Sequence, residues 1–118
     1  MAIHYNSKTS RKLLRSVQPI KNVQINLQHC KAATYNLDQL IIQQDVDIVY
    51  IQEPYLFQNK LSGISKRHRI FTSGNGVKRA AIVVSNKQID ALQINQLSEE
   101  DIVVIEFSLG QLKFIAAS

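Results

Sequence analysis

The sequence predicts an α/β domain, because three neighbouring segments carry the patterns of a strand, a helix and a second strand. Residues 21–27 alternate between apolar and polar side chains, and residues 32–44 repeat apolar side chains at helical spacing. Residues 46–51 are almost continuously apolar. A strand–helix–strand unit of about 30 residues is the βαβ motif that builds parallel sheets. The whole chain, with 118 residues, has the length of one domain.

The composition is that of an ordinary globular domain, with 45% hydrophobic and 19% charged residues. No apolar run approaches the roughly 20 residues that cross a membrane. The N-terminal segment lacks an apolar stretch followed by a small-residue cleavage site, so we expect no secretory signal and no membrane partner. The single cysteine, Cys30, cannot form an internal disulfide, and we therefore expect an intracellular compartment.

The first predicted strand and the predicted helix each have one apolar face. In residues 21–27, three apolar side chains alternate with polar ones, which is typical of a strand with one buried face; they are Val23, Ile25 and Leu27. Asn26 therefore lies on the opposite face. In residues 32–44, four side chains form an apolar stripe; they are Ala33, Leu37, Leu40 and Ile41.

The second predicted strand runs directly into a carboxylate. Its apolar, β-branched sequence is typical of a strand covered on both faces, and Gln52, Glu53 and Pro54 follow it. Open α/β sheets bind ligands at the carboxyl ends of their strands, and Mg²⁺ prefers oxygen ligands such as carboxylates. If the two strands are parallel neighbours, Asn26 and Glu53 emerge at the same edge. From position alone, Glu53 could equally be an ordinary surface residue and Asn26 a turn residue.

The rest of the chain predicts two hairpins. We expect one over residues 68–85, with turn residues at 73–76, and one formed by residues 102–107 and 112–116. Residues 54–67 are predicted to be a loop, and residues 89–97 alternate too imperfectly for an assignment. Residues 1–20 are predicted to be a basic, flexible leader with a short helix at 12–17, so that the domain occupies residues 21–118.

The net charge of +5 is unevenly distributed. Residues 1–21 and residues 54–89 carry several lysines and arginines and no acidic residue, whereas residues 90–118 are net acidic. Two basic blocks favour a polyanionic partner, although such runs are also common on solvated surfaces. His29 and Cys30 are adjacent, which is not zinc-ligand spacing, and the chain has no Gly-rich phosphate loop, nucleophile elbow or deaminase motif.

Two stretches together resemble the start of the endonuclease domain of non-LTR retrotransposons. They are VQINLQHCKAA at 23–33 and DIVYIQEPYL at 47–56, and the first is similar to the INL-x-x-C-K-A-A opening of arthropod-type elements. KRAAIVVSN at 78–86 and IVVIEFSLGQLKFIAAS at 102–118 follow in the family's order. The resemblance covers residues 21–118 and extends to the endonuclease/exonuclease/phosphatase superfamily, which includes apurinic-site endonucleases.

The resemblance implies a four-layered α/β sandwich, of which this chain is the N-terminal half. It also implies metal-dependent cleavage of phosphodiesters, with Mg²⁺ as the usual cofactor and Mn²⁺ as an alternative. By position, Glu53 matches the metal-binding glutamate of the family's QEP motif, and Asn26 matches the active-site asparagine of the first strand. Gln28 stands where related repair enzymes often have an aspartate. For contacts with the DNA backbone we predict Arg67, Lys78 and Arg79.

Three later motifs of the family do not occur in the chain. They are the Tyr-x-Pro, Gly-Asp-x-Asn and Ser-Asp-His blocks, which in the family supply the phosphate-orienting tyrosine, an Asp/Asn pair and the general-base Asp-His pair. A nuclease needs a base, or an equivalent group, to make the attacking water nucleophilic. We therefore expect a truncated domain that is inactive alone, so the sequence leaves open whether this chain is itself an enzyme.

The function implied by the resemblance is nicking of target DNA, which primes reverse transcription by a downstream reverse transcriptase domain in the nucleus. Two alternatives remain open from the sequence. One is a catalytically dead, nucleic-acid-binding remnant of a degenerate element. The other is a phosphatase or phosphodiesterase of the same superfamily, although the basic leader and the INL block favour DNA as the partner.

Overall fold

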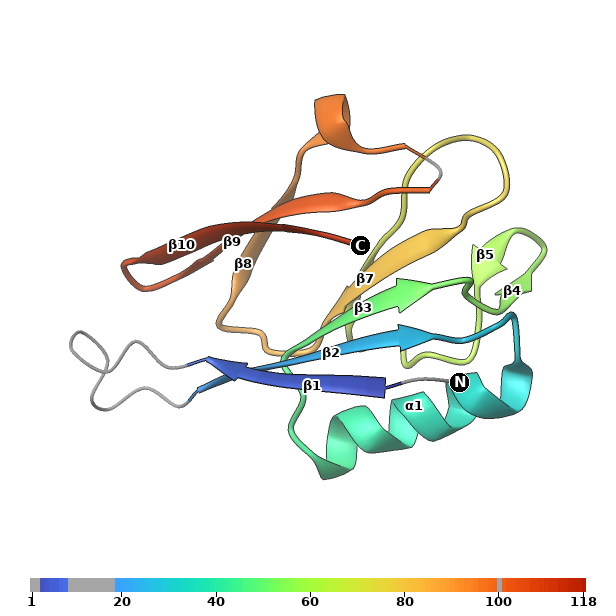
Figure 1. Ribbon diagram of the computed structural model, residues 1–118, viewed down its shortest axis with the longest axis horizontal. Coiled ribbons are helices and arrows are strands. Elements are labelled where there is room, and N and C mark those ends of the chain that lie inside the picture. Colours follow the sequence, from blue (N-terminus) through green and yellow to red (C-terminus); the bar gives the residue numbers. More distant parts are fainter. Residues whose placement is uncertain (1–2, 9–18, 100) are drawn as a thin grey trace.

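The computed structural model describes residues 3–8, 19–99 and 101–118, and it shows a mixed α/β domain (Figure 1). A five-stranded sheet has the order β1-β2-β3-β7-β6, and a three-stranded sheet has the order β10-β9-β8. A short hairpin, β4–β5, and one α-helix, α1, complete the described regular structure together with one 3₁₀ turn. The elements are β1 (Ile3–Lys8), β2 (Ile20–Asn26), α1 (Lys31–Gln43), β3 (Ile48–Gln52), β4 (Leu56–Phe57), β5 (Lys60–Leu61), β6 (Arg69–Phe71), β7 (Ala80–Val84), β8 (Asp90–Gln93), η1 (Asn95–Leu97), β9 (Val104–Leu109) and β10 (Leu112–Ala117).

The predicted strand–helix–strand unit is confirmed. β2 and β3 are parallel neighbours, with Asn26 opposite Gln52 at their carboxyl ends. α1 covers one face of the large sheet, and its buried side chains include Ala33, Leu37 and Ile41, as the apolar stripe predicts. Thr34 is also buried, which the stripe did not predict. Its hydroxyl donates to the carbonyl of Cys30, so burial leaves the hydroxyl paired.

The other face of the large sheet packs against the small sheet. Alternate residues of β3 point to the two sides, so Val49 and Ile51 join the core under α1 while Ile48 and Tyr50 join the core between the sheets. This is the two-sided burial that the continuous apolar run predicts. Phe107 of β9 is fully buried in the second core, and its ring stacks on that of Phe114 at a centroid distance of 5.1 Å.

The prediction of an unstructured leader is wrong for Ile3–Lys8. These residues form β1, which pairs antiparallel with β2 at the edge of the large sheet. An edge strand is held by backbone hydrogen bonds to one neighbour, so it needs no apolar period in its sequence. The helix predicted at 12–17 lies outside the described residues.

Both predicted hairpins are confirmed, as β6–β7 and β9–β10 pair antiparallel. The unassigned segment 89–97 contains β8, which pairs with β9. Residues 54–67 are not wholly loop, because β4 and β5 form a hairpin of two-residue strands. Strands this short have no detectable period, which is why the pattern missed them. Among the described residues, no helix is long and apolar enough to cross a membrane.

The segment after this hairpin is anchored on α1. Gly63 has a φ of +90°, and a β-carbon at this position would lie 2.9 Å from the Cγ2 methyl group of Thr34. Ile64 is buried in the core under the helix, and the backbone N–H of Ser65 donates to the Asp38 carboxylate at 2.9 Å. The base of the β4–β5 hairpin is therefore fixed by close backbone approach, core packing and a hydrogen bond.

The amino end of β3 is joined to its neighbours by Asp47. The carboxylate of Asp47 accepts from the N–H of Lys21 at 2.8 Å and from the Asn86 amide at 3.2 Å, and its carbonyl accepts from the N–H of Ser85 at 2.9 Å. A pocket of about 270 Å³ lies beside it, lined in part by His68. Burial lowers the pKa of His68, and the Asp38 carboxylate opposes that shift.

Candidate active site

Asn26 ends β2 at the carboxyl edge of the large sheet. Its side-chain oxygen accepts the backbone N–H of Gln28 at 2.8 Å, and Gln28 has a left-handed φ of 52°. This bond uses one lone pair of the amide oxygen and orients the side chain, so that the NH₂ group of Asn26 can meet a ligand. Asn26 therefore offers a hydrogen-bond donor that suits a phosphate oxygen.

Glu53 follows β3 directly and has a φ of 50°, an unusual value for a residue with a side chain. Its N–H donates to the carbonyl of Arg79 at 3.0 Å, and its carbonyl accepts the N–H of His29 at 2.9 Å. The backbone of Glu53 is thus held between the loop after β2 and the start of β7. The side chain is 48% exposed, so a half-exposed carboxylate stands on a fixed backbone. Backbone strain of this kind concentrates at functional sites.

His29 joins the loop after β2 to the turn after Glu53. Its Nδ1 lies 3.0 Å from the Pro54 carbonyl oxygen, so Nδ1 carries the proton and donates to that carbonyl. Its Nε2 lies 4.0 Å from a carboxylate oxygen of Glu53, which is too long for a hydrogen bond. Cys30 follows as the N-cap of α1, accepting the N–H of Ala33. His29 therefore lies in the loop before α1, and Cys30 begins the helix as its N-cap.

We expect His29→Ala to lower the free energy of unfolding by about 1 kcal/mol, because it removes the hydrogen bond to the Pro54 carbonyl. His29→Asn is the matched control, since its amide NH₂ can occupy the position of Nδ1. Urea unfolding of the two variants beside the wild-type chain measures the difference. Equal losses in both variants would show that ring packing, rather than this hydrogen bond, holds the turn.

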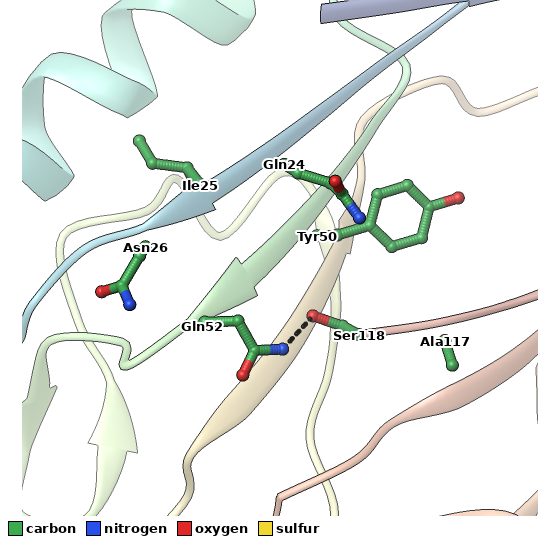
Figure 2. A pocket seen from close by; sticks show the side chains of 7 residues that line it. All are labelled: Gln24, Ile25, Asn26, Tyr50, Gln52, Ala117 and Ser118. Carbon is green, nitrogen blue, oxygen red and sulfur yellow. Dashed lines mark hydrogen bonds between the residues drawn. The ribbon is translucent and has the colours of Figure 1, made fainter. Parts of the chain in front are cut away.

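A pocket of about 270 Å³ lies between the two sheets at this edge, and it includes Asn26 (Figure 2). Gln52 stands beside Asn26 on the neighbouring strand, and its amide donates to the Ser118 hydroxyl at 3.1 Å. That hydroxyl in turn donates to the carbonyl of Ile51 at 3.0 Å. Ser118 therefore links the end of the small sheet to the end of β3. The other lining residues are Gln24, Ile25, Tyr50 and Ala117.

Tyr50 gives the pocket a neutral polar group. Burial raises the pKa of Tyr50 to about 12, so its phenol stays protonated throughout the physiological pH range. Sequence reasoning missed Tyr50, Gln24 and Gln52 as site residues. They could have been found from the alternation of side chains along a strand. Once β2 and β3 are aligned in parallel, all three lie on the same face of the sheet as Asn26.

The structure brings together two of the three basic residues predicted to contact DNA. Lys78 and Arg79 precede β7 at the edge where Glu53 stands, since Glu53 donates to the Arg79 carbonyl. Arg67 precedes β6, whose first residue, Arg69, pairs with Val84 at the far end of β7. Arg67 therefore lies at the opposite end of the sheet and does not join Asn26 and Glu53.

The described residues could supply part of the ligand set of a magnesium ion. Glu53 can supply one carboxylate at an open position, and Mg²⁺ is usually held by one or two carboxylates together with waters and substrate phosphates. Among the residues that the structure describes, no group of three or more His, Cys, Asp or Glu side chains could hold a metal ion. The arrangement can therefore contribute one metal ligand and one donor for a phosphate oxygen.

Comparison with known proteins finds a similar solved structure but no similar family model or curated sequence. No protein-family model and no curated protein sequence matches the chain. Among solved structures, the chain matches the endonuclease domain of TRAS1, a telomere-specific non-LTR retrotransposon, with a TM-score of 0.72 and 30% sequence identity over 85% of this chain.

The resemblance to a non-LTR retrotransposon endonuclease domain is confirmed. The shared fold is a mixed α/β architecture of sheets with one helix in the described part of this chain. The match covers 43% of the TRAS1 structure, so the chain spans less than half the length of that relative.

Proposed function

We propose that this chain is the N-terminal part of a metal-dependent DNA endonuclease domain, which nicks target DNA so that a retrotransposon can prime reverse transcription. The observation that carries the proposal is the joint placement of Asn26 and Glu53. They stand at the carboxyl ends of adjacent parallel strands, in a fold shared with the TRAS1 endonuclease domain. Open α/β sheets use this edge for ligands.

Glu53 is the proposed ligand of Mg²⁺ or Mn²⁺, and Asn26 is the proposed donor to a phosphate oxygen of the substrate. A bound divalent ion supplies Lewis-acid stabilisation of the charge that develops on the phosphoryl group. Glu53 suits this role because its backbone is fixed from two sides while its carboxylate stays half exposed. Asn26 suits its role because its amide oxygen is already paired with Gln28, which orients the NH₂ group outward.

We also propose that the complete domain is a four-layered sandwich, in which further helices cover the outer face of the small sheet. On that face, Leu92, Glu106 and Ile115 form a row across β8, β9 and β10. Leu92 is 66% exposed and Ile115 is 59% exposed. Apolar side chains on one face of a sheet are normally buried against another layer, which supports the fourth layer.

DNA is the proposed partner because the edge that holds Glu53 also holds Lys78 and Arg79, within a segment of 36 residues, 54–89, that has no acidic residue. A reverse transcriptase domain downstream and a nuclear location follow from the same proposal. The phosphatase alternative has no observation in its favour, whereas the match to a retrotransposon endonuclease domain favours DNA.

The chain alone is proposed to be inactive, because the Tyr-x-Pro, Gly-Asp-x-Asn and Ser-Asp-His blocks of the family do not occur in it. Incubation with supercoiled plasmid and Mg²⁺ should leave the plasmid intact, and Mn²⁺ should nevertheless broaden NMR signals around Glu53. Glu53→Gln should abolish the broadening, whereas Glu106→Gln, on the small sheet beside Lys113, should preserve it. Robust nicking lost in Glu53→Ala would refute the proposed inactivity.

The same experiment separates the nuclease fragment from a catalytically dead remnant. This second candidate is favoured by the lack of a clustered metal site in the described residues. Broadening that does not depend on Glu53, together with salt-sensitive binding of DNA, would favour the remnant. Broadening that requires Glu53 favours the nuclease fragment.

A further inference from the structure

The β4–β5 hairpin carries an aromatic ring into solvent beside the candidate active site. The ring belongs to Phe57, which is 61% exposed although it is one of only four phenylalanines in the chain. The hairpin lies next to the carboxyl ends of β2 and β3, where Asn26 and Glu53 stand (Figure 1). A single exposed apolar side chain is common on protein surfaces, so Phe57 is informative only together with the residues around it.

The hairpin is rigidly built. Phe57 pairs with Lys60 across the turn, and the two residues between them, Gln58 and Asn59, have φ values of 53° and 59°. Two consecutive left-handed residues are the geometry of a tight two-residue hairpin turn. At the other end, Leu61 packs against the core under α1. Phe57 is thus displayed by a fixed backbone.

A second exposed apolar side chain lies on the loop that the hairpin contacts. The Asn59 side chain donates to the carbonyl of Gly76 at 3.0 Å, which ties the hairpin turn to residues 72–79. Val77, the next residue on that loop, is 60% exposed. Lys78 follows and donates to the carbonyl of Gly74, which closes the loop on itself. The two apolar side chains therefore project from two loops that are held together.

The charge around these side chains is positive. Lys60 stands opposite Phe57 and Lys78 follows Val77, and no acidic residue occurs between 54 and 89. Arg79 is paired at 3.4 Å with Asp101, and both side chains are largely exposed. An exposed aromatic ring together with lysines on the same two loops is an arrangement on which nucleic-acid bases can stack while their phosphates are neutralised.

We propose that Phe57 and Val77, with Lys60 and Lys78, form a surface that binds DNA containing an unstacked base, and that the base stacks on the ring of Phe57. This inference rests on the proposed function, since it assumes that DNA is the partner of this edge. It adds the form of DNA that the site selects: a strand whose bases are locally open.

The preference for open bases follows from the geometry of stacking. In a fully paired duplex, both faces of each base are covered by neighbouring bases, so an aromatic side chain can reach a face only by unstacking a step. A single-stranded or bulged site offers a free base face without that cost. Lys60 and Lys78, by contrast, meet phosphates equally well in either form and confer no such preference.

Fluorescence anisotropy of the full chain with three labelled DNAs tests the proposal: a paired duplex, the same duplex with a single-nucleotide bulge, and the single strand. The wild-type chain should bind the bulged duplex and the single strand more tightly than the paired duplex. Phe57→Ala should weaken binding to these two by about 10-fold and remove the preference. Phe57→Trp should keep it, and Leu92→Ala, which removes an exposed apolar side chain on the other sheet, should change nothing.

Lys60→Gln should weaken binding to all three DNAs alike and reduce the slope of log affinity against log salt by about 1. If Phe57→Ala weakens binding to all three DNAs equally, or to none, the stacking surface is refuted while DNA binding stands. If the wild-type chain binds none of the three, the proposed DNA partner itself fails. Circular dichroism of each variant confirms that the fold is retained.

Discussion

Phe107→Ala is expected to lower the free energy of unfolding by about 3–5 kcal/mol. Phe107 is fully buried between the two sheets and stacks on Phe114, so its removal loses apolar burial and leaves a cavity. The total stability of a small domain is about 5–15 kcal/mol, and the variant therefore approaches the threshold of unfolding at room temperature.

Urea unfolding followed by circular dichroism measures this loss. The matched control is Phe57→Ala, which removes the same ring from an exposed position and should change stability by no more than about 0.5 kcal/mol. Comparable losses in the two variants would mean that the sheets do not pack through Phe107.

Gly63→Ala is expected to cost about 2 kcal/mol or more, for two reasons that act together. Its φ of +90° is unfavourable for any residue with a β-carbon, and that carbon would lie 2.9 Å from the Thr34 methyl group. α1 cannot shift without disturbing the core around Leu37 and Ile41. The close contact between the new β-carbon and Thr34 therefore cannot be relaxed at low energetic cost.

Gly110→Ala is the control for the backbone contribution. Gly110 has a φ of +58°, but a β-carbon there would meet nothing within 4 Å, so only the left-handed strain of about 1–2 kcal/mol applies. Thermal and urea unfolding of both variants should show the larger loss at Gly63. If the two losses are equal, contact with Thr34 contributes nothing, and the anchoring of the hairpin on α1 is not rigid.

The local sequence predicted the elements whose burial, on one face or on both, leaves a pattern in the side chains. Val23 and Ile25 alternate with polar residues because one face of β2 meets α1, and the apolar run ending at Ile51 reflects burial of β3 on both faces. β1 and the β4–β5 hairpin were missed because their stability comes from backbone pairing with a neighbour, which leaves no period in the side chains.

The sequence predicted the site residues that stand at the ends of parallel strands. It did not predict the contacts between residues far apart in the chain. Asn26 and Glu53 follow from the βαβ unit, since parallel neighbours end at one edge. The bond between Gln52 and Ser118 joins residues 66 positions apart, and no local pattern encodes such a contact. Arg67 lies apart from Lys78 and Arg79 because β6 runs antiparallel to β7 and begins at the other end of the sheet, and no local pattern shows this separation.

Asp47 ties β2, the start of β3 and the segment after β7 together at one end of the large sheet. Its carboxylate and carbonyl hold Lys21 of β2 and the segment after β7 to the start of β3, at the end of the sheet away from Glu53. Strand register is thereby held at this end by Asp47, and at the other end by the backbone hydrogen bonds of Glu53 to Arg79 and His29. β3 is therefore tied to its neighbours at both ends, and it cannot change register at one end alone.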